Sequence, residues 1–161
     1  MLSTIVITAL LIALDQLTKY LATLYLAPVG TLPFLPGIME LHYILNDGAA
    51  FSILAGSRWL LIAVTAAALA GIGWYLLARR PKARLEYISL LLIWAGGIGN
   101  LIDRVLHGTV VDFFAVTFTN FAVFNVADCY VTVGVCLLLL FYIIKEVRDA
   151  KQKKAAGNDK P

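Results

Sequence analysis

Two aspartates stand where an ionisable side chain is expensive, and they are the first candidates for chemistry. Asp112 lies inside the apolar stretch "VVDFF" and Asp128 precedes a long apolar run; neither has a Lys or Arg within four residues. Burial raises the pKa of a carboxyl group, and two carboxylates brought together would share one proton. In an aspartic protease, the ionised member of such a pair draws a proton from water while the neutral member protonates the carbonyl oxygen. Asp112 and Asp128 are therefore a candidate acid/base pair.

Further polar residues gather close to the ends of apolar segments. Asp15 and Lys19 are spaced i,i+4, so they can pair on one helix face. Gly96, Asn100 and Asp103 also share a helix face, at i, i+4 and i+7. The polar candidates are Asp15, Lys19, Asn46, Gly48, Asn100, Asp103, Arg104 and Asn125.

Several of these residues also have a purely structural explanation. Asp15 with Lys19, and Asp103 with Arg104, could be charge pairs at helix ends. Asn125 could be only the N-cap of the last apolar helix. The glycines of "AGGIGN" would let membrane helices approach closely. These explanations do not account for Asp112 or Asp128.

No metal site is predicted. The sequence has no H-E-x-x-H motif, and neither His42 nor His107 has a Cys or a carboxylate at ligand spacing. Cys129 and Cys136 are seven residues apart in one predicted helix, too far for a disulfide within it, so we interpret them as packing residues.

The elements that must position these residues are membrane spans. The chain has 161 residues, of which 61% are hydrophobic and 14% charged, too apolar for an ordinary soluble domain. Residues 59–78 carry no charge and would reach about 30 Å as a helix, roughly the hydrocarbon thickness. Three similar windows cover residues 2–24, 87–102 and 129–144, so the sequence predicts an all-α membrane protein with four transmembrane helices.

The distribution of basic residues predicts the orientation. Lys and Arg crowd the link after the second span and the segment after the fourth, so both are expected in the cytoplasm, together with the N-terminus. These anchors explain the net charge of +3, and no nucleic-acid surface is expected. We expect one domain over residues 1–149 and a polar, disordered cytoplasmic tail over 150–161.

The two longer connections, about 25–58 and 103–128, then lie on the outer side and hold most of the polar candidates. "IMELHYIL" alternates polar and apolar residues, as a half-exposed strand does, and "TVVDFF" and "NFAVFN" are also β-prone. We expect a small outer β-sheet and a loop cap over the bundle.

Taken together, the motifs resemble the lipoprotein signal peptidase family, also called signal peptidase II. The ordered motifs that carry the resemblance are "DQLTK", "NDGAAF", "GGIGNLIDR", "VVDF" and "FNVAD". The resemblance covers nearly the whole chain except the C-terminal tail.

The resemblance implies an aspartic endopeptidase of the bacterial inner (cytoplasmic) membrane. Members remove signal peptides from diacylglyceryl-modified prolipoproteins, cutting on the N-terminal side of the lipidated cysteine, at the outer face and without a metal or organic cofactor. It implies catalytic roles for Asp112 and Asp128, and structural support from Asp15 and Lys19. Substrate binding or shaping of the site is implied for Asn46, Gly48, Asn100, Asp103, Arg104 and Asn125.

The expected partners are the prolipoprotein substrate and membrane lipids, with the chain itself a monomer. Phe51, Phe113 and Phe114 are candidate contacts for the diacyl chains. Two other functions stay open on the residues alone. One is a small proton- or ion-coupled transporter whose carboxylates relay protons, and the other is a scaffold without catalysis. The absence of a visible inverted repeat argues against the transporter.

Overall fold

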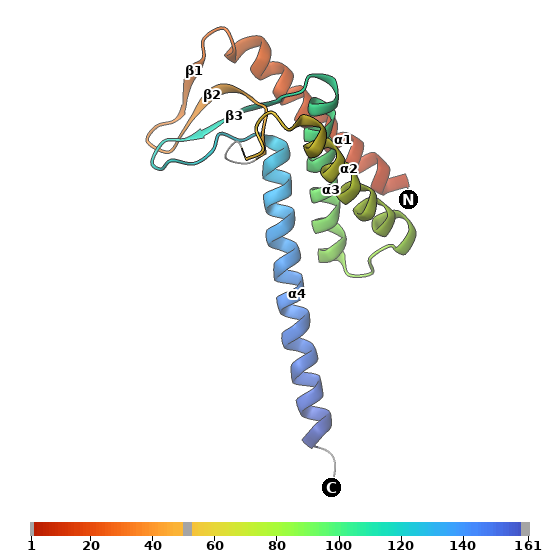
Figure 1. Ribbon diagram of the computed structural model, residues 1–161. Helices are drawn as coiled ribbons and strands as arrows, with labels where there is room; N and C mark the ends of the chain where they lie inside the picture. The colour runs from red at the N-terminus through yellow and green to blue at the C-terminus, as the bar shows by residue number, and fades with distance from the viewer. Residues whose placement is uncertain (1, 50–52, 159–161) are drawn as a thin grey trace.

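The structure, a computed structural model, describes residues 2–49 and 53–158 (Figure 1). Four helical segments in the described residues are long and apolar enough to cross a membrane, as predicted: Leu2–Leu26, Arg58–Arg79, Arg84–Leu106 and Val126–Lys153. The first is α1 (Leu2–Leu21) continued by a π-helical turn, η1 (Ala22–Leu26), and the second is α2 (Arg58–Trp74) continued by η3 (Tyr75–Arg79). The third is α3 (Arg84–Leu106), and the fourth lies within α4 (Val126–Asn158).

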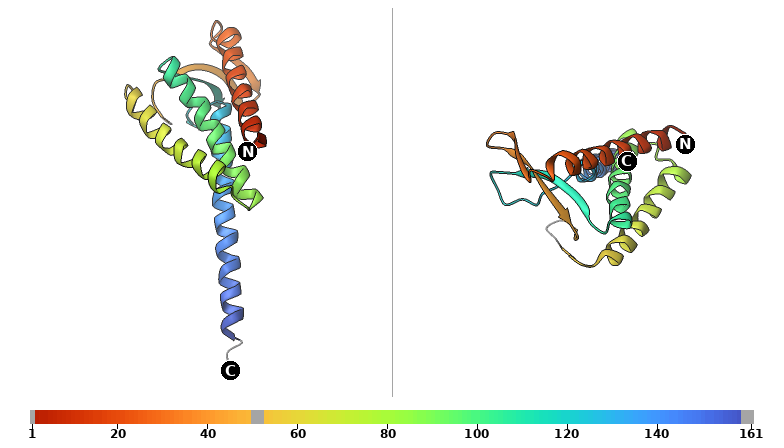
Figure 2. Two further views of the ribbon diagram at one scale, coloured as in Figure 1. Left: turned by 90° about the vertical axis from the view of Figure 1, so that its right-hand side faces the viewer. Right: turned by 90° about the horizontal axis from the view of Figure 1, so that it is seen from above.

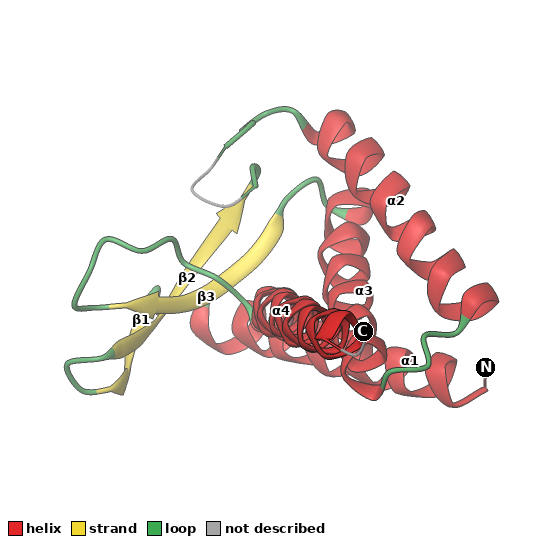
Figure 3. Cartoon of the chain, turned by 90° about the horizontal axis from the view of Figure 1, so that it is seen from below, coloured by secondary structure: helices red, strands yellow, loops and turns green. Residues whose placement is uncertain are grey.

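Helix α3 is the centre of the bundle, because it packs against α1, α2 and α4. Figure 3 shows the bundle from below, with α4 end-on beside α3 and α1. The glycines of α3 permit these contacts: a Cβ atom at Gly96 would collide with the carbonyl oxygen of Ala127 in α4. A Cβ atom at Gly97 would press on Leu69 of α2, and one at Gly99 on Asp15 of α1. Small residues thus do allow close packing here, as expected.

The bundle is polar inside and apolar outside. Asp15, Lys19, Asn100 and Asp103 are at most 9% exposed, while many large hydrophobic side chains of all four helices are exposed. In water this pattern would be unfavourable, but a hydrocarbon surrounding removes the cost of exposed apolar surface. The interior is therefore available for hydrogen-bonded and charged side chains.

A three-stranded antiparallel sheet lies at one end of the bundle, in the order β1 (Thr31–Leu35), β2 (Met39–Asn46), β3 (Val110–Val116). It joins the two long connections, because β2 precedes α2 and β3 follows α3. Strand β1 was not predicted, since Pro33 interrupts its pattern, but an edge strand tolerates a proline. The predicted strand "NFAVFN" makes only a single bridge, between Phe124 and Phe114.

The sheet rests on a small apolar cluster. Ala22 and Leu26 of η1 pack with Phe113 of β3, and partly buried residues such as Tyr43 and Val126 surround them. Phe113 is 6% exposed, so its expected contact with lipid is wrong: alternation along β3 turns it toward η1. Phe51 lies outside the described residues.

Helix α4 is longer than predicted and continues to Asn158. The segment 150–158, expected to be disordered, is helical, because Ala, Lys and Gln are good helix formers and extend a helix already begun. Figure 2 shows α4 running on beyond the other three helices, away from the sheet.

Candidate functional site

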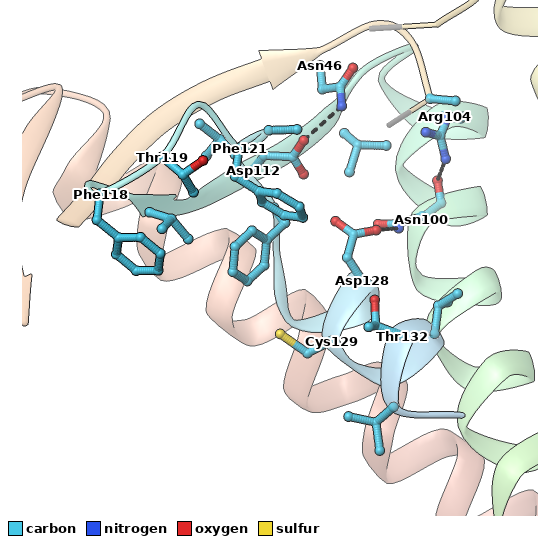
Figure 4. Close-up of a pocket in the computed structure, with 18 residues that line it drawn as sticks. Asn46, Asn100, Arg104, Asp112, Phe118, Thr119, Phe121, Asp128, Cys129 and Thr132 are labelled. Carbon is cyan, nitrogen blue, oxygen red and sulfur yellow. Dashed lines mark hydrogen bonds between the residues drawn. The ribbon is translucent and has the colours of Figure 1, made fainter. Parts of the chain in front are cut away.

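Two carboxylates open into one cavity at the sheet end of the bundle (Figure 4). Asp112 comes from the middle of β3, and Asp128 comes from the first turn of α4. The cavity has a volume of about 630 Å³, and Asn46, Asn100 and Arg104 also line it. The structure therefore brings the two aspartates to a common space from elements far apart in the sequence.

Asp112 is held by two amide side chains. The register of the sheet places Ile44 opposite Asp112, which makes Asn46 its diagonal neighbour, and Asn46 Nδ2 donates to Asp112 Oδ2 at 2.8 Å. Asn125 Nδ2 donates to Asp112 Oδ1 at 2.7 Å. Burial, with the negative charge of Asp128 adding to it, raises the pKa of Asp112 to about 6 although both amides oppose the shift. Asp112 is thus poised to hold a proton in mildly acidic solution.

Asp128 is fixed by the start of α4. Asn125 caps this helix: its Oδ1 accepts the Asp128 backbone N–H at 2.9 Å, and its own backbone N–H donates to Asp128 Oδ2 at 3.1 Å. This reciprocal pair is a capping box, so Asn125 is an N-cap, but its contact with Asp112 shows that it is not only an N-cap. Asn100 Nδ2 donates to the other oxygen, Asp128 Oδ1, at 2.7 Å. Both Asp128 oxygens therefore have fixed donors.

Arg104 links the outer loop to the site. Its Nη2 donates to the carbonyl oxygen of Gly48 at 2.8 Å, and its Nη1 reaches that of Asn100 at 3.4 Å. The backbone N–H of Gly48 in turn donates to Asn46 Oδ1 at 2.9 Å. This contact directs the Asn46 amide nitrogen toward Asp112.

A buried ionic cluster supports the site from the bundle side. Lys19 Nζ lies 2.9 Å from Asp15 Oδ2 and 2.8 Å from Asp103 Oδ2. Asp15 Oδ1 also accepts the backbone N–H of Ala127 at 2.9 Å, which ties α1 to the start of α4. A buried ion pair is stable only with such additional hydrogen bonds.

The two aspartates and the eight polar candidates named from the sequence all lie in this one region, in the cavity, at its rim or in the supporting cluster. Two residues were missed. Gln16 donates to Asp103 Oδ1 at 3.0 Å, and Arg58 donates from Nε to the carbonyl oxygen of Arg104 at 2.8 Å, capping α3. Arg58 is the lone cation at the outer end of an uncharged span, and that isolation could have marked it.

The rest of the cavity wall is apolar. Apart from Thr119 and Thr132, it is formed by apolar residues of the loop between β3 and α4 and of the first turns of α4, including Phe118, Phe121, Phe124, Val131 and Val133. Such a wall suits an apolar ligand next to a small polar centre. Within residues 2–49 and 53–158, no group of three or more His, Cys, Asp or Glu side chains is arranged to hold a metal ion.

Known proteins are similar to this chain in sequence and in fold. Residues 7–144 match the model of the family described as Signal peptidase (SPase) II. The lipoprotein signal peptidases of Streptococcus pyogenes serotypes M6 and M1 are each 46% identical to the chain over 132 residues, covering 81% of this chain and 86% of theirs.

Two solved bacterial membrane enzyme structures have the same fold. One has a TM-score of 0.80 and 29% identity, covering 91% of this chain and 90% of its own; the other has a TM-score of 0.78 and 29% identity, covering 87% and 92%. These matches do not support the transporter alternative. The chain is a multi-pass bacterial membrane protein and belongs to the signal peptidase II family.

Proposed function

We propose that this signal peptidase is an aspartic endopeptidase in which Asp112 and Asp128 share one proton. The observation that carries the proposal is the opening of both carboxylates into one cavity, each held by side-chain amides. The substrate is a diacylglyceryl-modified prolipoprotein, cut on the N-terminal side of the lipidated cysteine. The working unit is a monomer with one peptidase domain over residues 1–149.

The chemistry follows from one neutral and one ionised carboxyl group. The raised pKa of Asp112 supports Asp112 as the protonated member. Asp128 accepts a proton from a water molecule as the water oxygen attacks the scissile carbonyl carbon, and Asp112 gives its proton to the carbonyl oxygen. The tetrahedral intermediate, a gem-diol, then collapses: one hydroxyl proton returns to Asp112 as the C=O bond forms again, the C–N bond breaks, and the leaving amine takes the proton from Asp128. No metal or organic cofactor takes part.

The polar rim and the apolar wall have different tasks. Arg104 and Asn46 lie where they can hydrogen-bond a substrate backbone, and the apolar wall accepts side chains of the signal peptide. A bond held in this partly dehydrated space feels stronger charge effects than one in water.

The proposed topology puts the site at the outer face of the inner membrane. The basic link between η3 and α3, the N-terminal end of α1 and the tail of α4 all point away from the sheet (Figure 1). Cationic segments favour the cytoplasm, so the sheet and cavity face outward. A lipid-anchored substrate presents its bond at that interface.

The direct test is cleavage of a diacylglyceryl prolipoprotein by the purified full chain in detergent. We expect Asp112→Asn and Asp128→Asn each to lower kcat by at least about a thousandfold, since each removes one partner of the acid/base pair. Asp149→Asn, the same change farther along α4, should keep wild-type activity. Substantial cleavage by both site variants would exclude the dyad, and a wild-type chain that cuts nothing would refute the peptidase reading.

A further inference from the structure

The side chain of Lys19 has a second contact beyond its ion pairs, and this contact leads toward the reacting carboxylates. Lys19 is 3% exposed, and its Nζ donates to Asn100 Oδ1 at 2.8 Å in addition to its ion pairs with the carboxylates of Asp15 and Asp103. An ammonium group has three N–H donors and no acceptor. One of these donors is used on the Asn100 amide oxygen, and the ammonium charge faces the two carboxylates.

This contact decides which way the Asn100 amide points. Only the amide oxygen can face an ammonium group, because an NH₂ group in that place would meet a second donor. Asn125 Nδ2 donates to the same oxygen at 3.1 Å. With its oxygen so fixed, the Asn100 Nδ2 group must face the cavity, where it donates to Asp128 Oδ1 at 2.7 Å.

The Asn125 amide connects this arrangement to the other aspartate. Its Nδ2 group donates to Asn100 Oδ1 at 3.1 Å and to Asp112 Oδ1 at 2.7 Å, with a longer contact to the carbonyl oxygen of Val111 at 3.4 Å. The buried ammonium group thus orients the Asn100 amide, while the capping box orients the Asn125 amide, and each amide donates to one of the two carboxylates.

We propose that Lys19 is a positioning residue for the peptidase reaction, which acts through the Asn100 amide to hold Asp128 in its working orientation. The proposal rests on the dyad of Asp112 and Asp128. It goes beyond structural support, because a merely structural lysine would contribute to folding and not selectively to kcat.

The charges around Lys19 give the proposal a pH signature. The charged and titratable groups near it are Asp15 of α1, Asp103 and Arg104 of α3, Asp112 of β3, and Asp128 and Tyr130 of α4. The positive charge of Lys19 lowers the pKa of Asp112, against the stronger effect of burial. Removing that charge should therefore raise the pKa at which the dyad loses its shared proton.

The test is a double-mutant cycle measured as kcat and KM on the full chain, with Lys19→Met, Asn100→Ala and their combination. We expect Lys19→Met to lower kcat about ten- to a hundredfold, with KM changed less than about threefold. In the Asn100→Ala background the same change should lower kcat less than about threefold, since the amide it orients is already gone. Lys145→Met, on the exposed part of α4, is the matched control.

The pH profile supplies the second readout. In Lys19→Met the alkaline limb of kcat should move to higher pH, whereas Lys19→Arg, which keeps the charge, should leave the limb in place and restore part of kcat. An equal loss in both Asn100 backgrounds, or an unmoved limb in Lys19→Met, would overturn the proposal.

Further controls distinguish a positioning effect of Lys19 from a loss of folding and from a failure of the proposed dyad. Lys19→Met leaves Asp15 and Asp103 without their cation, so folding is checked by gel filtration and thermal unfolding. If the variant does not fold, the same cycle is run in the Asp15→Asn background, where the Asn oxygen can still accept the Ala127 N–H and one uncompensated charge is removed. The proposal can fail while Asp112→Asn and Asp128→Asn remain inactive, which distinguishes its failure from failure of the dyad.

Discussion

The buried carboxylates of this site can carry a negative charge because side-chain amides donate hydrogen bonds to them. Asp112 is 2% exposed, yet Asn46 and Asn125 give each of its oxygens a donor. The sequence could predict Asp112 and Asp128, because a carboxylate in an apolar stretch is costly and needs a reason. It could not predict the contacts of Gln16 or Arg58, which depend on how α1 and α2 meet α3.

The pKa of Asp112 makes stability depend on pH. The pKa of this carboxyl group is about 6 in the folded chain against 3.8 ordinarily, so the folded state binds the proton more tightly and loses stability as pH rises between these values. Asp112→Asn stays neutral and escapes this loss, which is about 3 kcal/mol at most.

We therefore expect the unfolding temperature of Asp112→Asn, relative to wild type, to increase from pH 4 to pH 7. Thermal unfolding in detergent measures this difference, with Asp149→Asn as the control that should show no trend. A difference that stays constant across this pH range would contradict the raised pKa.

Among the elements, the close contact between α3 and α4 fixes the position of Asp128 relative to α3. Gly96 lies against the carbonyl oxygen of Ala127, the residue directly before Asp128. The four spans could be predicted because hydropathy alone defines them, and β2 and β3 because their patterns alternate or are β-prone. Strand β1 could not be predicted, because a proline interrupts its pattern. The full length of α4 could not be predicted either, because its polar extension has no distinctive hydrophobic pattern.

Gly96→Ala should push α4 away from α3, because the new methyl group meets backbone rather than a movable side chain. We expect a loss of about 2 kcal/mol or more in stability and a lower kcat, since Asp128 moves with Ala127. Gly71→Ala in α2 is the matched control: no neighbouring atom lies within 4 Å of its new Cβ, so stability should be unchanged or slightly higher. Equal unfolding temperatures for the two variants would show that the α3–α4 contact is not tight.

The whole molecule has the form of a compact bundle and sheet with one long helix projecting from it (Figure 2). The cavity lies at the sheet end, and the exposed basic residues Lys151 and Lys153 lie at the far end of α4. The cavity proposed for the reaction and the basic segment proposed to lie in the cytoplasm are therefore at opposite ends of the molecule.

A chain ending at Asp149 should keep wild-type kcat and KM, because residues 150–158 form the far end of α4, away from the cavity. A fluorescent protein fused after residue 149 should fluoresce in the cytoplasm, and alkaline phosphatase fused at the same point should be inactive. Active phosphatase at this position would contradict the proposed topology and place the end of α4 on the outer side.

The capping box at the start of α4 also limits which parts of the site can move during a reaction. Asp128 holds the Asn125 backbone N–H with one oxygen and the Asn100 amide with the other, so its carboxylate cannot swing without breaking both hydrogen bonds. In the proposed reaction the scissile bond is therefore brought to Asp128, rather than Asp128 to the bond.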